Sequence, residues 1–248
     1  MQKEISLAMW EKRFIESAIK AYQFDFPVFT PFLTPPEYEL AKIQAKKNGT
    51  SIFLFGGYED SERKIACFSN NEILQNQFKV SALQLRWKGF LLTHRDVLGS
   101  LMALGIERNT IGDILVNKDN AVIFCLHKIL PFLYDNLSII GKNKVSCSIC
   151  ETLPTIAKAE GKEVKSTVSS PRLDAIVATA FRLSRTKASQ LITGGFVKLQ
   201  YQPCIKPDVN VNSGDRITLR GMGKAHLLFL GEPTKKGRIP VSLVVYGK

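Results

Sequence analysis

Ser170-Pro171-Arg172-Leu173-Asp174 begins the segment from which the fold of the C-terminal third can be predicted. Leu183-Ser184-Arg185-Thr186-Lys187-Ala188 and Leu191-Ile192-Thr193-Gly194-Gly195-Phe196-Val197 follow it. The stretch ends with Ser213-Gly214-Asp215-Arg216-Ile217-Thr218-Leu219-Arg220-Gly221-Met222-Gly223-Lys224. Its helix caps, apolar residues and glycines predict two helices followed by short strands.

The first of these helices is expected to be capped by Ser170, with Pro171 as its first residue. Apolar residues then recur on one helical face; they are Leu173, Ile176, Val177, Ala180 and Phe181. Ser184 is expected to cap a second, shorter helix that ends at Gly194 or Gly195 and buries an apolar side. Two or three strands should follow, with Gly214-Asp215 as the turn before the last.

Three cations of this stretch lie where a helix dipole disfavours positive charge. Arg172 stands at the start of the first helix, and Arg185 and Lys187 stand in the first turn of the second. Because helix N-termini and basic side chains both attract phosphate, this arrangement favours a docked polyanion. A solvated basic face is the alternative interpretation.

The charge of the whole chain points the same way. The 248 residues carry a formal net charge of +12, and it is unevenly placed. Residues 169–248 hold 13 Lys and Arg against 4 Asp and Glu, which gives +9, while residues 1–168 hold 21 against 18, which gives +3. A nearly balanced body with a basic C-terminal third predicts a polyanionic partner for that third.

The pattern R-L-D, S-R-x-x-A, L-I-x-x-G-x-V, G-D-x-I and R-G-x-G-K closely resembles the S-four domain, a small RNA-binding fold named after ribosomal small-subunit protein four. About 55 residues share it, with five blocks in order. One departure is Leu199-Gln200-Tyr201, where many members carry Val-Asn-Gly, so the hairpin turn is in question. The resemblance and the charges together predict RNA-binding side chains at Arg172, Arg182, Ser184, Arg185, Thr186, Lys187, Gln190, Lys198, Arg220, Lys224, Lys235, Lys236 and Arg238.

The rest of the chain predicts an α+β protein with two further domains. Residues 1–76 should form an N-terminal α/β domain, with helices at 1–21 and from Thr34 to 47 and strands at 51–55 and 63–68. Residues 77–155 follow the order β-α-β-β-α-β of a ferredoxin-like or RNA-recognition-motif-like fold. The polar segment 156–168 is predicted to be a linker, and residues 169–248 an S-four domain with a C-terminal strand extension.

The N-terminal two-thirds also resembles one family. Phe55-Gly56-Gly57-Tyr58-Glu59, Leu92-Thr93-His94-Arg95-Asp96-Val97-Leu98-Gly99 and Ile111-Gly112-Asp113-Ile114-Leu115, followed by the S-four stretch, are similar to the bacterial YlmH family. This resemblance implies RNA binding on the ribosome, where members are associated with a large subunit that holds peptidyl-tRNA after translation has stalled. The expected partners are rRNA, tRNA and the large subunit, with no small-molecule substrate.

Chemical motifs elsewhere are weak. His94-Arg95-Asp96 imitates a kinase catalytic loop, but Leu101 stands where the metal-binding Asn belongs, so a capped helix start is favoured. Cys147 and Cys150 have metal-ligand spacing but no second pair, and in a strand they would face opposite sides. We therefore expect neither metal nor cofactor. Five scattered cysteines and the lack of an apolar run of about 18 residues predict a reduced cytoplasmic protein without a membrane span.

An RNA-modifying enzyme, similar to a pseudouridine synthase and with an unrecognised active site in residues 1–155, remains the alternative hypothesis. S-four domains also occur on pseudouridine synthases, which need an Asp after Gly-Arg-Leu, and Asp174 follows Arg172-Leu173. Asp174 is better explained as a first-turn acid that the helix dipole favours, so we expect no catalytic residue. A ribosome-assembly scaffold is a further alternative. Trp87, Phe90 and Phe124 are candidates for stacking on RNA bases in the central domain, or for its core.

Overall fold

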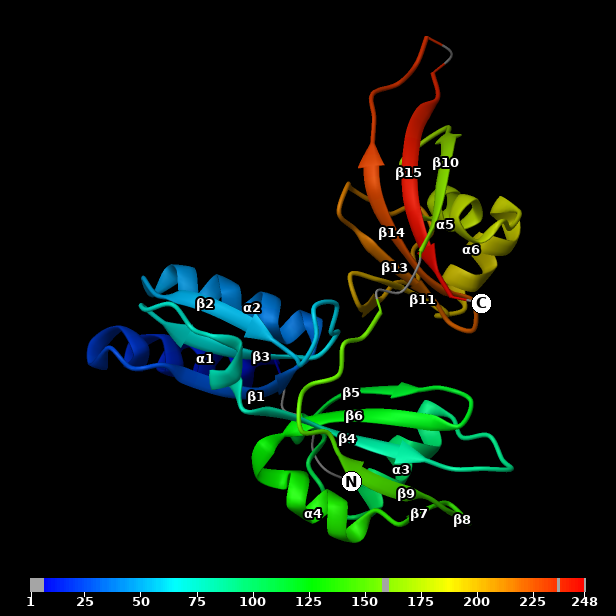
Figure 1. The fold of residues 1–248 in the computed structure, drawn as a ribbon. Helices are drawn as coiled ribbons and strands as arrows, with labels where there is room; N and C mark the ends of the chain where they lie inside the picture. Colours follow the sequence, from blue (N-terminus) through cyan, green and yellow to red (C-terminus); the bar gives the residue numbers. More distant parts are fainter. Residues whose placement is uncertain (1–6, 158–160, 236, 248) are drawn as a thin grey trace. The chain divides into compact units, whose positions relative to one another are not determined.

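The computed structural model describes residues 7–157, 161–235 and 237–247. The chain divides into two compact units, Met1–Ile156 and Ala157–Lys248 (Figure 1). Both units combine helices with antiparallel sheets, so the predicted α+β class is confirmed. The part of the first predicted helix that covers residues 1–6 lies outside the described residues.

The N-terminal part of the first unit is a three-stranded sheet covered on one face by two helices (Figure 1). The strands pair in the order β1-β3-β2. The helices are α1 (Leu7–Phe24) and α2 (Pro35–Lys47), and the strands are β1 (Val28–Leu33), β2 (Ser51–Phe55) and β3 (Lys64–Ser69). Trp10, Phe14, Ala18 and Ala21 are buried on one side of α1, as their helical spacing predicts.

The start of α2 is fixed locally by its sequence. Thr34 is the N-cap, prolines occupy the first turn, and the Glu37 carboxylate accepts the Thr34 backbone N–H at 2.6 Å. This bond satisfies a donor that the helix cannot use itself. The predicted helix from Thr34 to residue 47 is therefore confirmed.

The central part of the first unit is a four-stranded antiparallel sheet in the order β5-β6-β4-β9, with helices on one face. It follows the chain order β-α-β-β-α-β, with the outer strand of one half beside an inner strand of the other, so the ferredoxin-like prediction is confirmed. The main elements are β4 (Val80–Arg86), α3 (His94–Ala103), β5 (Ile111–Val116), β6 (Asn120–Leu126), α4 (Leu130–Asn136) and β9 (Ser146–Ile149). Short pieces join them: η1 (Gln75–Phe78), η2 (Arg108–Thr110), η3 (His127–Ile129), β7 (Ile139–Ile140) and β8 (Asn143–Lys144).

The face of this sheet away from its helices is partly covered. Phe124 is fully buried under the ring of Tyr58, with ring centroids 5.1 Å apart, and Leu153 and Ile156 pack on the same cluster. Gly57 permits this contact, because a Cβ at its φ of +108° would lie 2.3 Å from the Phe124 ring. Trp87 is buried in the core on the helix side. Neither aromatic ring is exposed for base stacking.

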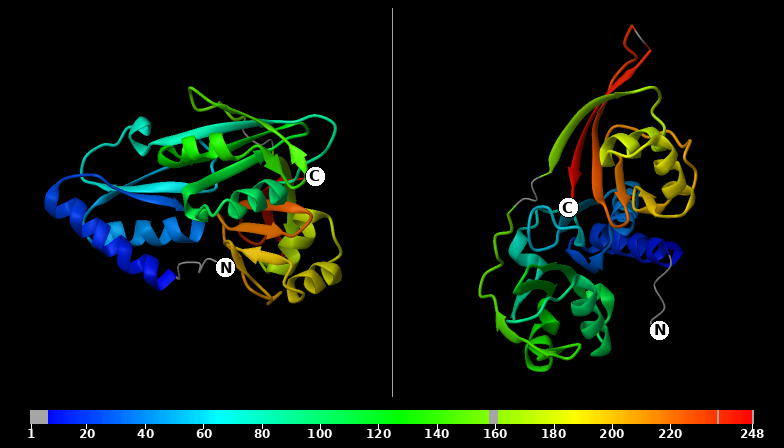
Figure 2. Two further views of the ribbon diagram at one scale, coloured as in Figure 1. Left: turned by 90° about the horizontal axis from the view of Figure 1, so that it is seen from below. Right: turned by 90° about the vertical axis from the view of Figure 1, so that its right-hand side faces the viewer.

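The second unit is a six-stranded antiparallel sheet in the order β10-β15-β14-β13-β11-β12, with α5 and α6 packed on one face (Figure 2). Its elements are β10 (Lys162–Val168), α5 (Leu173–Phe181), α6 (Arg185–Thr193), β11 (Val197–Leu199), β12 (Gln202–Pro203), β13 (Arg216–Leu219), β14 (Gly223–Leu230) and β15 (Ile239–Tyr246). Ser184 caps α6 as predicted, and its Oγ accepts the Lys187 N–H at 3.2 Å.

The predicted linker is wrong over residues 162–168. These residues form β10, which pairs along its length with β15 and buries Val168 in the core. The segment is polar because its other side chains, among them Glu163 and Lys165, alternate outward from an edge strand. Its partner, β15, lies about 75 residues away in sequence, so local composition carries no sign of the pairing.

The predicted start of α5 is also wrong. The helix begins at Leu173 with Arg172 at the N-cap position, and neither Ser170 nor Pro171 is in it. The Leu173 and Asp174 N–H groups donate to the carbonyls of Val209 and Pro207, at 2.8 and 3.0 Å. A distant segment therefore satisfies the donors that a capping side chain would otherwise take.

The hairpin at the departure from the S-four pattern does form. Gln200 and Tyr201 connect β11 to β12 with φ values of 48° and 66°, the left-handed pair that a two-residue hairpin turn needs. Asn and Gly take these angles at lower cost. Here side chains support the turn, since Gln200 Nε2 donates to Asp215 at 2.9 Å and the Arg216 guanidinium lies 5.9 Å from the Tyr201 ring centroid.

Candidate nucleic-acid interface

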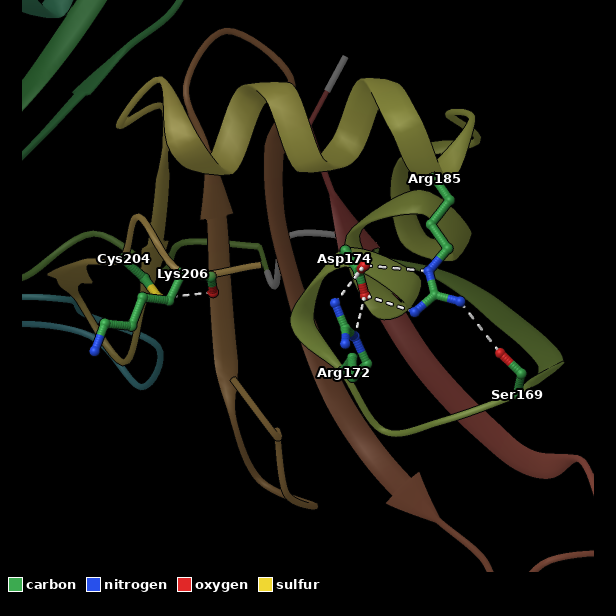
Figure 3. Close-up of polar contacts among 6 residues, drawn as sticks. All are labelled: Ser169, Arg172, Asp174, Arg185, Cys204 and Lys206. Atoms are coloured by element: carbon green, nitrogen blue, oxygen red, sulfur yellow. Dashed lines mark hydrogen bonds and ion pairs between the residues drawn. The ribbon is translucent and has the colours of Figure 1, made fainter. Parts of the chain in front are cut away.

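Asp174 is the centre of the corner between α5 and α6 (Figure 3). Its side chain is buried, and its two carboxylate oxygens accept hydrogen bonds from two guanidinium groups. Arg172 donates through Nε and Nη2 at 3.3 and 3.2 Å, and Arg185 donates through the same pair of nitrogens at 3.2 Å each. Arg185 also reaches Ser169 Oγ at 3.4 Å. The carboxylate thus joins the segment before α5 to the first turn of α6.

The charge state of Asp174 follows from these contacts. Burial alone would raise the pKa of its carboxyl, but the hydrogen bonds and positive charges of Arg185 and Arg172 outweigh burial and hold the pKa below its usual value. Asp174 is therefore ionised at neutral pH. It neutralises one of the two guanidinium charges, so Arg172, Arg185 and Asp174 together keep a net charge of +1.

The prediction that a docked polyanion accounts for the cations at these helix starts needs a correction, because Asp174 accounts for two of them. Arg172 and Arg185 both bind Asp174, whereas no hydrogen bond or ion pair is recorded for the side chain of Lys187 within the described chain. Arg182, Thr186 and Gln190 are exposed beside it, as is Ser184. The structure thus brings together seven predicted side chains at the α5–α6 corner.

Lys198 and Lys224 lie on the other face of the sheet. Lys198 stands between Val197 and Leu199, which contribute to the core under the helices, so its side chain projects from the opposite face. Thr218 pairs with both lysines across the strands, which places the three side chains in one row. The sequence did not separate these two faces.

The remaining predicted residues lie at two turns. Arg220 is exposed where β13 ends. Lys235 and Arg238 lie in the loop between β14 and β15, and the Arg238 guanidinium donates to Thr167 Oγ1 at 2.7 Å, so it also holds that loop to β10. Lys236 lies outside the described residues.

Sequence reasoning missed Arg216. It pairs with His226, lies two residues before Thr218 on β13, and projects from the face that carries Lys198 and Lys224. The alternation of Arg216 with the apolar Ile217 and Leu219 was a sufficient signal in the sequence.

In the first unit, two of the blocks that resemble the YlmH family meet at Asp113. The Asp113 carboxylate accepts from the Tyr58 hydroxyl at 2.7 Å and from the backbone N–H groups of Glu62 and Arg63 at 2.6 and 3.0 Å. Burial, together with the Asp113 charge, raises the pKa of Tyr58 far above its ordinary value. These groups satisfy one another, so the junction fastens the 56–63 loop to β5.

Cys147 and Cys150, the two cysteines with metal-ligand spacing, lie on opposite sides of the central sheet. Cys147 faces the helix-side core and donates to the Leu137 carbonyl, while Cys150 packs on the other face, as the strand spacing predicts. Burial raises the pKa of both thiols. Within the described ranges, no three His, Cys, Asp or Glu side chains gather as metal ligands would.

Comparison with known proteins identifies a matching domain model and a similar protein. Residues 74–153 match the model of the putative RNA-binding domain in YlmH. The chain is 29% identical over 237 residues to "Ribosome-associated protein quality control protein P2" of Bacillus subtilis (strain 168), with 92% of each chain covered.

A solved structure of the "Cell division protein ylmH from Streptococcus pneumoniae" shares the fold. The TM-score is 0.53 at 24% identity, over 60% of this chain and 95% of the other. The matched domain coincides with the central sheet and helices described above. The chain is therefore similar to YlmH proteins in its central domain, and to the Bacillus relative over nearly its whole length.

Proposed function

We propose that this protein binds RNA on the ribosome without catalysing a reaction, and that its targets are large-subunit rRNA and (peptidyl-)tRNA in the rescue or quality control of stalled translation. The match of residues 74–153 to a putative RNA-binding domain carries the proposal. The name of the Bacillus relative supports the ribosomal setting and, with it, the cytoplasm. Among the described helices, none is both long and apolar enough to span a bilayer.

The second unit supports the same proposal as an S-four-like RNA-binding domain. At the α5–α6 corner, Arg182 and Lys187 are exposed cations, and Ser184, Thr186 and Gln190 add hydrogen-bonding groups. Phosphate contacts from such cations supply affinity, and polar side chains beside them position the backbone. The proposed partners are structured RNAs and the large subunit.

Asp174 offers an argument against the pseudouridine-synthase alternative. A catalytic carboxylate must reach its substrate, but that of Asp174 is buried and bonded to two guanidinium groups on the protein itself. Its contacts are those of a structural anion. A role in holding α5 against α6 accounts for them fully.

The test is crosslinking of the protein to RNA in cells, with sequencing of the attached fragments. We expect fragments from large-subunit rRNA and from tRNA. Modified nucleosides are measured in parallel in cells with and without the protein, and we expect equal levels. A nucleoside missing only in the deletion strain would establish an enzyme, and crosslinks confined to other RNAs would refute the ribosomal assignment.

A further inference from the structure

A groove in the central domain is separate from the cationic corner of the second unit. It has a volume of about 720 Å³ and lies at one end of the four-stranded sheet. Gln84 and Arg86 of β4, Asn120 of β6 and Ser146 of β9 line it, and Lys88 and Lys144 stand on its sides. The buried ring of Trp87 also contributes to the lining.

The groove is positively charged. Arg86, Lys88 and Lys144 are exposed, and no ion pair involving them is recorded among the described residues. The Arg86 guanidinium has one neutral contact, with Gln84 Oε1 at 3.4 Å. The acid in the lining is Asp119, whose carboxylate accepts the Asn120 amide at 2.8 Å. Three cations against one carboxylate attract an anionic ligand.

The lining is built on paired strands and a fastened turn. Asn120, Arg86 and Ser146 pair across β6, β4 and β9, so their side chains form one row on the sheet face away from the helices. Ser146 Oγ donates to the Arg86 carbonyl at 3.2 Å. The Trp87 backbone N–H donates to the Asp119 carbonyl at 3.0 Å, and this hydrogen bond holds the 117–120 turn in place. The strands and the turn therefore fix the backbone positions from which the side chains of the groove project.

The other half of the same sheet face is closed, because Tyr58, Leu153 and Ile156 cover Ala82 and Phe124 there. The groove end carries hydrogen-bonding side chains and cations, and the aromatic ring in it, Trp87, is 5% exposed. Base stacking requires an exposed ring face, whereas phosphate and ribose require only cations and polar groups.

We propose that this groove binds the sugar–phosphate backbone of a single-stranded RNA segment, with Arg86, Lys88 and Lys144 on the phosphates and Asn120 and Ser146 beside them. The inference rests on the proposed function and adds a second RNA contact in the first unit. Because the contacts go to the backbone, binding at the groove is indifferent to base sequence.

The test uses the full-length chain and a labelled 12-nucleotide oligouridine. Arg86, Lys88 and Lys144 are changed together to Gln, and affinity is measured at rising salt. We expect the logarithmic salt slope to fall in magnitude by about two, since each phosphate contact on single-stranded nucleic acid contributes about 0.7. A 4-thiouridine version of the RNA should crosslink to peptides that contain residues 84–88 or 143–146 in the unchanged protein.

A matched control removes the same charge elsewhere in the first unit. Lys12, Lys20 and Lys47 are exposed on α1 and α2, and their change to Gln should leave the slope within about half a unit. Equal losses in the two triple variants would overturn the groove assignment while the proposed function stands. An oligoglutamate of equal charge that competes as well as RNA would also overturn it. If the unchanged protein binds neither the oligouridine nor ribosomal subunits, both proposals fail.

Discussion

At the scale of single residues, one guanidinium group can stabilise the fold and still meet RNA. Arg185 uses Nε and Nη2 on Asp174, which leaves further N–H donors of its five for a phosphate. Arg172 is arranged in the same way. The contacts with Asp174 were not apparent from the sequence pattern, which showed only the cations. The partner carboxylate lies two residues from Arg172 and eleven from Arg185.

Asp174→Asn should therefore destabilise the second unit. Two guanidinium groups lose a charged acceptor, and hydrogen bonds to charged groups contribute about 1.5–3 kcal/mol, so we expect the free energy of unfolding to fall by about 1–3 kcal/mol at pH 7. Urea denaturation followed by circular dichroism measures this loss. An unchanged midpoint would show that the carboxylate charge contributes nothing to stability.

The loss should disappear in acid. Because the folded-state pKa of Asp174 is lowered, its contribution is present above the unfolded value of about 3.9 and is lost as pH falls through the folded value. The unchanged protein and the variant should thus converge in stability once the pH is below the folded-state pKa of Asp174. A gap that persists undiminished at that pH would assign the effect to the shape of the amide and not to ionisation.

At the scale of elements, local sequence predicted what local contacts fix. Thr34 with Glu37 and Thr93 with Asp96 form reciprocal capping bonds within one turn, and α2 and α3 begin where those residues are. The order of strands and helices from β4 to β9 could be predicted because apolar and polar residues alternate along the strands and turn residues separate them. These features can be predicted without knowing which distant segments of the chain are in contact.

The failures have a common physical cause. The start of α5 is set by carbonyls of Pro207 and Val209, and β10 exists because β15 offers it a ladder of hydrogen bonds. Both depend on segments more than 30 residues away. The same holds for the candidate site, since only strand register separates the Lys198 face from the α6 corner.

At the α5–α6 corner, two kinds of cation should behave differently. Arg182 and Lys187 have no recorded polar side-chain partner in the described chain, so changing both to Gln should leave stability within about 0.5 kcal/mol and lower the salt slope of RNA binding by about one to two. Arg185→Gln should instead lower stability, because Asp174 loses a bidentate partner.

The measurements are urea denaturation and binding to purified large subunits at rising salt. Lys162 and Lys206 are exposed in the same unit, and their joint change to Gln is the control for net charge. If this control lowers the slope as much as the Arg182 and Lys187 pair does, the corner is not an interface. If Arg185→Gln is as stable as the unchanged protein, its contact with Asp174 is dispensable.

At the scale of the whole molecule, the boundary of the basic segment differs from the boundary of the second folded unit. The charge rises at residue 169, with +9 in residues 169–248, but the second unit begins at Ala157 and needs β10. Val164 and Val168 of that strand pack on the core, and Thr167 accepts from Arg238. A domain boundary drawn from charge alone therefore removes part of the fold.

Fragments make this difference measurable. Residues 157–248 should unfold cooperatively, whereas residues 169–248 should be less stable by about 3 kcal/mol or more. The shorter fragment loses the buried Val168, since a fully buried valine contributes about 1.5–3 kcal/mol, and the partly buried Val164. It also loses the hydrogen bonds of β10 and exposes β15 as an edge. Urea denaturation of both fragments tests this. Equal urea midpoints for the two fragments would show that residues 162–168 act as a linker and add nothing to stability.

The longer fragment also allows a test of how much each unit contributes to the affinity and the selectivity of RNA binding. The second unit carries most of the net charge, and phosphate contacts give affinity with little sequence information. Residues 157–248 should therefore bind many structured RNAs with a steep salt dependence. The full chain should be more selective, because two linked modules gain effective concentration only where both of their sites are present.

Co-sedimentation with purified subunits at rising salt compares the full chain, residues 1–156 and residues 157–248. We expect the full chain to persist longest on the large subunit, residues 157–248 to dissociate earlier and less selectively, and residues 1–156 to bind weakly. Binding by residues 1–156 that is as tight as that of the full chain would transfer the role of anchor to the central domain and its groove.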